Sequence, residues 1–128
     1  MSYYFSKKLQ VPFAEAVDQV TEALQQEGFG ILTEIDVQAT LKEKLDVDFR
    51  PYKILGACNP TMAHQALQEE EMIGTMLPCN VIVQDRGAGV VEVAAVDPVA
   101  SMKAVENPNL AEIAAQVQAQ LRSIIEAL

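Results

Sequence analysis

The stretch CNVIVQDRGAGVVEVAAVD, residues 79–97, consists of two mostly apolar segments separated by the glycine-rich RGAG. Short glycine-rich loops join the strands of β-hairpins, so the stretch predicts strands at CNVIVQD and VVEVAAVD. Unbroken apolar runs are typical of strands in the interior of a sheet. We therefore expect the rest of the fold to be built around this hairpin.

Upstream of the hairpin, the hydrophobic pattern predicts three strands that alternate with three helices. The strands are YYFSKKL, FGILTEID and YKILGACN. Pro12 suits the first turn of a helix, and Gly28 suits its end. Asp36 can cap a second, short helix, and Pro60 begins a third, PTMAHQALQEEEM. The first helix presents one apolar stripe, formed by Phe13, Val17, Val20 and Leu24.

Downstream of the hairpin, Asp97-Pro98 predicts a corner between a strand and a short helix, with Asp97 as the cap. Asn109 and Glu112 fit the capping-box pattern at the start of the last helix. The order β-α-β-α-β-α-β-β-α predicts one α+β domain over residues 1–128, with helices packed on a mixed five-stranded sheet in two layers. Helices on one face leave an apolar face open, which predicts a homodimer.

Composition limits the classes of partner. The 128 residues carry a formal net charge of −9, with a pI of about 4.4, so we expect no nucleic-acid partner and no membrane-surface partner. No apolar run reaches the ~20 residues that span a bilayer. The two cysteines are expected to be free thiols in a reducing compartment. These features predict an acidic cytoplasmic protein.

The two cysteines occupy similar settings, GACNP around Cys58 and LPCNV around Cys79. Cys58 precedes a predicted helix, whose amino terminus can favour a reactive thiolate, although a free cysteine is also a common buried residue. A simple crossover would place Cys58 and Cys79 at opposite edges of the sheet. Alternatively, MIGTMLP is long enough to return the chain, and the two Cys-Asn corners then meet.

Three further patterns are weaker. Cys58, Cys79 and His64 could hold a soft metal, copper or zinc, but closed zinc sites use four ligands. Glu34 and Asp36, or Asp97, could act as acid and base, although capping also explains Asp36 and Asp97. Asn59 and Asn80 can hold loop amides. No nucleophile elbow, phosphate loop or dinucleotide fingerprint occurs, so catalytic residues are unknown and we expect no cofactor.

The segment EGFGILTEIDVQATLKEKLDVDFRPYKILGACNPTMAHQAL, followed by GTMLPCNVIV and VDP, resembles the prokaryotic domain-of-unknown-function family three hundred and two. The resemblance covers nearly the whole chain and implies a compact α+β domain, paired as a homodimer, with no agreed activity. RGAG is shorter than the acidic loop expected in many relatives. Signature positions under this resemblance are Glu34, Asp36, Cys58, Asn59, Pro60, Pro78, Cys79, Asn80, Asp97 and Pro98.

The sequence favours a binding or accessory protein for a small ligand, with its pocket near the Cys58-Asn59 corner or at the dimer seam. The alternative is thiol-redox or soft-metal chemistry by Cys58 and Cys79. The predicted ligand-binding residues are Cys58, Asn59, Cys79, Asn80, Glu34 and Asp36.

Overall fold

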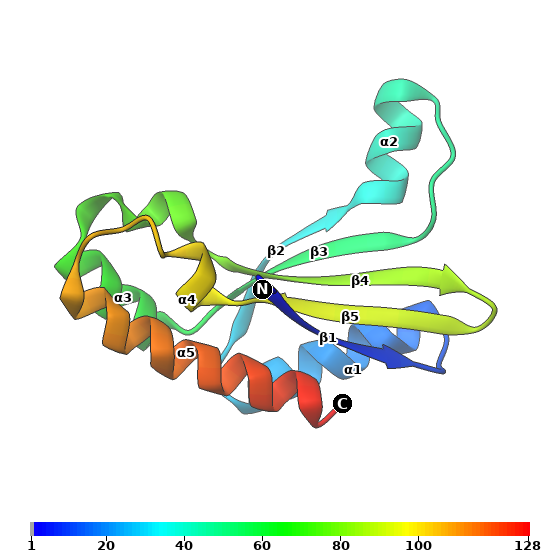
Figure 1. Cartoon of the computed structure of the whole chain (residues 1–128). Coiled ribbons are helices and arrows are strands. Elements are labelled where there is room, and N and C mark those ends of the chain that lie inside the picture. Colours follow the sequence, from blue (N-terminus) through cyan, green and yellow to red (C-terminus); the bar gives the residue numbers. More distant parts are fainter. Residues whose placement is uncertain (1) are drawn as a thin grey trace.

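The five strands of the computed structural model, which describes residues 2–128, form one sheet in the order β1-β5-β4-β3-β2 (Figure 1). Every neighbouring pair is antiparallel. The strands are β1 Tyr4–Leu9, β2 Gly30–Asp36, β3 Tyr52–Cys58, β4 Cys79–Gly87 and β5 Val90–Val96. The helices are α1 Phe13–Gln26, α2 Val37–Leu45, α3 Pro60–Glu69, α4 Pro98–Ser101 and α5 Pro108–Glu126, with a 3-10 helix η1 at Glu71–Met76.

The structure confirms the α+β class and the predicted order of five strands and helices along the chain. The predicted mixed sheet is wrong, because the sheet is antiparallel throughout. The difference arises after α3. There η1 and the extended residues that follow it bring the chain back to the end of β3 at which it left the sheet, so β4 runs antiparallel to β3. A helix that crossed directly to the next strand would have made the pair parallel.

The hairpin of β4 and β5 forms as predicted and lies inside the sheet, with β3 on one side and β1 on the other. Its turn consists of Ala88 and Gly89, whose φ angles of 55° and 77° are those of a type I′ turn. The register shifts between Asp85 and Gly87, where the Asp85 carboxylate accepts a 2.8 Å hydrogen bond from the Gly87 amide.

α1 and α5 cover one face of the sheet (Figure 1) and enclose the main core with it. The stripe predicted for α1 is confirmed at Val17, Val20 and Leu24, which are buried, while Phe13 is partly buried against the same cluster. No described helix is long and apolar enough to cross a membrane. Strand residues in this core are Leu55, Ala57, Cys79, Val81, Val83, Val91, Val93 and Ala95.

Gly28 ends α1 as predicted, and it does so in a Schellman motif. The Phe29 amide donates to the Leu24 carbonyl at 2.9 Å, and the Gly28 amide donates to the Gln25 carbonyl at 3.1 Å. Gly28 has a φ of 86°, which residues with a Cβ rarely adopt. The motif turns Phe29, only 1% exposed, into the core just before β2.

Two helix boundaries differ from the sequence prediction. α5 begins at Pro108 and is capped by Asn107, so the predicted capping box of Asn109 and Glu112 is wrong. Pro108 has no amide hydrogen to lose at the first helical position, which favours the earlier start. α3 ends at Glu69 and not at residue 72, because the next residue is extended.

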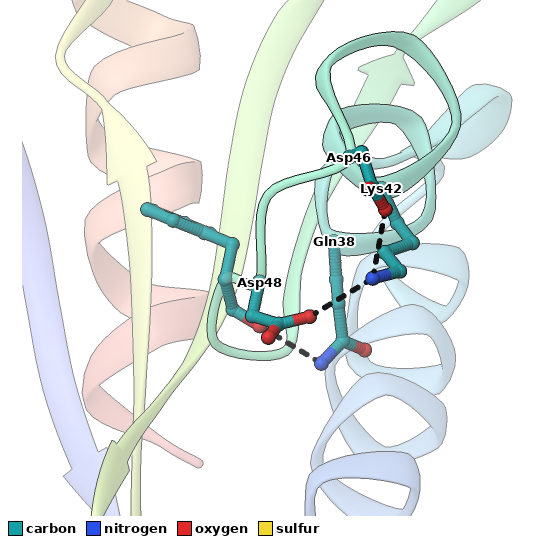
Figure 2. Close-up of polar contacts among 5 residues, drawn as sticks. Gln38, Lys42, Asp46 and Asp48 are labelled. Atoms are coloured by element: carbon teal, nitrogen blue, oxygen red, sulfur yellow. Dashed lines mark hydrogen bonds and ion pairs between the residues drawn. The ribbon is translucent and has the colours of Figure 1, made fainter.

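α2 stands away from α1 and α5, beyond the ends of β2 and β3 (Figure 1), and none of its residues is buried. The Asp36 carboxylate caps it as predicted, accepting from the Ala39 amide at 2.9 Å. At its other end, Lys42 forms ion pairs with Asp46 at 3.0 Å and Asp48 at 3.4 Å (Figure 2). These exposed contacts connect α2 to the loop that leads into β3.

Candidate functional site

The two Cys-Asn corners meet at one end of the sheet. In the register of β3 and β4, Ala57 lies opposite Cys79 and Gly56 lies opposite Asn80. The interpretation in which residues 72–78 return the chain is therefore confirmed, and the simple crossover with distant cysteines is wrong. Cys58, which ends β3, lies next to the first residue of β4.

A small cavity of about 40 Å³, named here the sulfur cavity, lies between this corner and the helices α3, α4 and α5. Four sulfur-bearing residues line it, namely both cysteines and two of the five methionines. They come from separate segments: Cys58 ends β3, Cys79 begins β4, Met62 belongs to α3 and Met102 follows α4. The remaining lining residues are Phe29, Ala57, Asn59, Ala63, Ala66, Leu77, Pro78, Pro98, Leu110, Ile113, Ala114 and Val117.

Burial favours the protonated form of both thiols. It raises the pKa of Cys79 to about 11, with a further contribution from the nearby Cys58, and it also raises the pKa of Cys58. The helix amino terminus beside Cys58 is already capped, because the side-chain oxygen Oδ1 of Asn59 accepts a 3.3 Å hydrogen bond from the Met62 amide. The arrangement therefore does not favour a reactive thiolate at Cys58.

His64 does not line the cavity and is exposed on α3. Successive helix residues are about 100° apart, so a residue two positions after the inward Met62 points away from the cavity. Within residues 2–128, no three histidine, cysteine or carboxylate side chains are grouped as a metal site. The hypothesis of a metal site formed by Cys58, Cys79 and His64 is therefore wrong for His64, which does not line the cavity.

Glu34 and Asp36 lie at the other end of β2 from the cysteine corner. Gly30 lies opposite Cys58, whereas Asp36 lies opposite Lys53. The Glu34 carboxylate forms a 2.7 Å ion pair with Lys53, and this hydrogen bond raises the pKa of Lys53. The predicted set of ligand-binding residues is therefore not one cluster.

Asp97 and Glu34 cannot act together as acid and base, because Asp97 follows β5 and Glu34 belongs to β2, and β3 and β4 lie between these two strands. Its carboxylate caps α4 as predicted, with a 3.0 Å hydrogen bond from the Val99 amide. It also accepts two hydrogen bonds from the Gln118 amide, at 3.1 and 3.2 Å. Asp97 therefore ties α4 to α5 beside the sulfur cavity.

Gly56 of the GACNP motif has a role that its sequence setting did not reveal. A Cβ at this position would lie 2.1 Å from Thr33 Oγ1 and 2.7 Å from Pro78 Cγ. Both distances are far below van der Waals contact, so only glycine allows β2 and the residue before β4 to close over β3. The GACNP and LPCNV motifs are thus joined by packing.

Asn80 lies away from the cavity, because successive strand residues point to opposite faces of a sheet. It lines a groove of about 520 Å³ on the sheet face opposite α1 and α5, named here the open-face groove. All three tyrosines of the chain line the groove, a feature that sequence reasoning missed. The lining is Tyr3, Tyr4, Lys8, Tyr52, Asn80, Ile82, Gln84, Arg86, Glu92, Ala94, Ala95 and Val96.

The groove carries charges of both signs although the chain is acidic. Lys8 and Arg86 line it with Glu92, whose carboxylate lies 3.7 Å from the Arg86 guanidinium. At one end the Arg50 guanidinium donates to the Gln84 side chain at 3.1 Å. The groove can thus offer aromatic rings, amides and a locally basic surface to a ligand.

Comparison with known proteins identifies the family. Residues 5–128 match DUF302, described as a domain of unknown function. The chain belongs to the DUF302 family. The match extends over nearly the whole chain. It therefore corrects the earlier description, which defined the family by its GACNP and LPCNV motifs.

A solved structure similar to this DUF302 chain is the crystal structure of an uncharacterized conserved DUF302 protein from Bacillus stearothermophilus. The two chains are 30% identical, 98% of each is covered, and the TM-score is 0.90. No curated protein matches the chain. The shared fold is therefore that of the family, and neither comparison names a ligand or an activity.

Proposed function

We propose that this protein is a homodimeric binding protein and that the open-face groove holds a small ligand at the seam of the dimer. The observation that carries the proposal is the groove itself, with its volume of about 520 Å³ and its three tyrosines. Ligand sites usually measure about 300–1,000 Å³ and combine apolar walls with a few polar groups. Tyr52, Asn80 and Gln84 supply such a combination.

The ligand class follows from the lining of the groove. Tyr3, Tyr4 and Tyr52 offer flat rings for stacking, and two cationic side chains stand against the single carboxylate of Glu92. This local excess of positive charge lies on a chain with a net charge of −9. A small, flat molecule with an acidic group fits these features.

The dimer is proposed from the same face. Ile82, Ala94 and Val96 are apolar groove residues on adjacent strands, and they lie on the face opposite α1 and α5. A twofold dimer brings one surface against its own copy, so a face with both Lys8 and Glu92 can pair unlike charges across the seam. The two free cysteines support a reducing, cytoplasmic location.

Thiol-redox chemistry receives less support than binding. Redox-active cysteines are usually ionised and accessible, whereas burial raises the pKa of both Cys58 and Cys79. Carboxylate acid-base catalysis also lacks support, because Glu34 belongs to β2 whereas Asp97 follows β5, and β3 and β4 lie between these strands.

The ligand is tested with 1-anilinonaphthalene-8-sulfonate, a flat fluorescent anion. We expect saturable binding, weakened about tenfold or more by Tyr52→Ala, because stacking and burial of an aromatic anchor contribute about 1.5 kcal/mol or more. Leu67→Ala is the matched control, since Leu67 is exposed on α3 and does not line the groove. Equal binding by the Tyr52→Ala variant and the wild type would refute the groove as the site.

The dimer is tested separately by sedimentation velocity. We expect the wild type to sediment as a dimer and Ile82→Arg to sediment as a monomer, whereas Leu67→Arg leaves the dimer intact. Circular dichroism of both variants shows whether the fold is retained. A monomeric wild type contradicts the dimer but leaves the dye-binding result to decide the ligand site.

A further inference from the structure

The sulfur cavity combines two features that the open-face groove does not share. It has four sulfur-bearing residues, and its only polar lining side chain is that of Asn59, which is used to cap α3. A buried water needs about two to four polar partners, so this lining is poorly suited to water. The volume of about 40 Å³ is suitable for one ion and too small for an organic cofactor.

We propose that the sulfur cavity binds one copper(I) ion, with the thiolates of Cys58 and Cys79 as the principal ligands and the thioethers of Met62 and Met102 completing the set. Thiolate and thioether sulfur are soft ligands that select copper(I) among the common biological metals. Zinc sites instead use four thiolate, imidazole or carboxylate ligands, and only two such side chains line this cavity.

The placement of the four residues fits a site assembled by the tertiary fold. The antiparallel register of β3 and β4 brings the two cysteines together, and α3 and the end of α4 each add one methionine. The other methionines of the described chain lie elsewhere, and Met72 is 74% exposed. Cys58 is half-buried and Cys79 is buried, so the ion is expected to enter at Cys58.

The binding step balances in charge and protons. One copper(I) ion replaces the protons of both thiols, forming two Cu–thiolate bonds and releasing two protons to solvent, and the neutral thioethers add two dative bonds without any proton release. No oxidant or reductant takes part, since the metal stays copper(I) and the sulfur remains thiolate. The site then carries one net negative charge.

The test is an anaerobic competition titration of copper(I) against a chromogenic chelator, bicinchoninate. We expect the wild-type chain to bind one copper(I) ion and Cys58→Ser to retain none. Met62→Leu and Met102→Leu should each lower the affinity for copper(I) about tenfold. This is in line with the losses of tenfold or more that follow changes around a metal site. Met72→Leu is the matched control, with the same chemistry outside the cavity, and should leave the affinity unchanged.

Several outcomes would overturn the site. These are no retention of copper(I) by the wild type, full retention by Cys58→Ser, or an equal effect of Met72→Leu and Met62→Leu. His64→Ala should have no effect, and a loss of binding there would overturn the assignment of the methionines. Circular dichroism identifies any variant that fails to fold. If a variant does not fold, an X-ray absorption spectrum of the copper-loaded wild type tests the ligand set instead. We expect only sulfur atoms as neighbours of the copper, and nitrogen or oxygen neighbours would overturn the site.

The copper site is independent of the proposed groove function. Tyr52→Ala alters the groove on the other face and should retain one copper(I) ion with wild-type affinity. A failure of dye binding therefore does not affect the proposed copper site, and a failure of copper binding does not affect the proposed ligand site in the groove.

Discussion

Replacement of Gly56 by alanine tests whether close packing explains the glycine of the GACNP motif. The new methyl group would lie 2.1 Å from Thr33 Oγ1 and 2.7 Å from Pro78 Cγ, so strand β2 or the Pro78 ring must move. Overpacking of a well-packed region costs about 1–3 kcal/mol and occasionally more. With two such contacts to a β-branched side chain and a proline ring, we expect Gly56→Ala to lower the free energy of unfolding by about 3 kcal/mol.

The control is Gly30→Ala, at a second glycine on the same pair of strands. No atom lies within 4 Å of a Cβ at Gly30, and its φ is not in the positive region. The free energy of unfolding should therefore change by no more than about 0.5 kcal/mol. Urea denaturation, followed by circular dichroism, measures both variants.

A double variant tests the identity of the contact. Thr33→Ala removes the oxygen at 2.1 Å but not the Pro78 contact at 2.7 Å. Gly56→Ala combined with Thr33→Ala should therefore recover part of the loss, with a coupling free energy of at least about 0.5 kcal/mol. The steric reasoning is refuted if Gly56→Ala costs no more than Gly30→Ala, or if the two substitutions are simply additive.

Three further predictions concern the corner and its supports. Asp97→Ala should cost about 2 kcal/mol in urea denaturation, since it removes the cap of α4 and both Gln118 hydrogen bonds, whereas Gln118→Ala should cost less. Because the pKa of Cys79 is raised from 9.0 to about 11, the unfolded chain loses this proton first as the pH rises. The free energy of unfolding should then fall between these two pH values, by at most about 1.4 kcal/mol per pH unit. Cys79→Ala should make this fall shallower. An unchanged slope in the variant would contradict the raised pKa of Cys79. An aromatic disulfide reagent should label Cys58 slowly in the native protein and Cys79 only after unfolding, and rapid native labelling of Cys79 would contradict its burial.

Local patterns in the sequence predicted the fold because each element carries its own signal. The RGAG loop between two apolar runs predicted the hairpin, and the spacing of Val17, Val20 and Leu24 predicted the buried face of α1. Gly28 lies at the helix end that its freedom to adopt a positive φ favours, and Asp36 and Asp97 lie at the helix starts that their carboxylates cap. In each case the deciding sequence signal lies within a few residues along the chain.

The features that the sequence did not predict depend on contacts between distant residues. Asn107 and Asn109 are both good caps, and the side chain of Asn109 instead donates to the Glu69 carboxylate at 2.9 Å. The direction of β4 depends on how residues 70–78 pack, which no local pattern fixes. Likewise, Met62 and Met102 line the same cavity only because α3 and α4 both pack against α5 near one corner of the sheet.

The LPCN segment contributes one residue to each face of the sheet. Cys79 points toward the helices and the sulfur cavity, whereas Asn80 points to the open-face groove, because side chains alternate along β4. Pro78 rests against Gly56 and thereby helps to fix the register that places both residues. A shift of one residue would exchange their faces, with the amide in the apolar cavity and the thiol in the groove. The close contact at Gly56 is therefore a shared structural requirement of both proposed sites, even though their ligands and chemistry are separate.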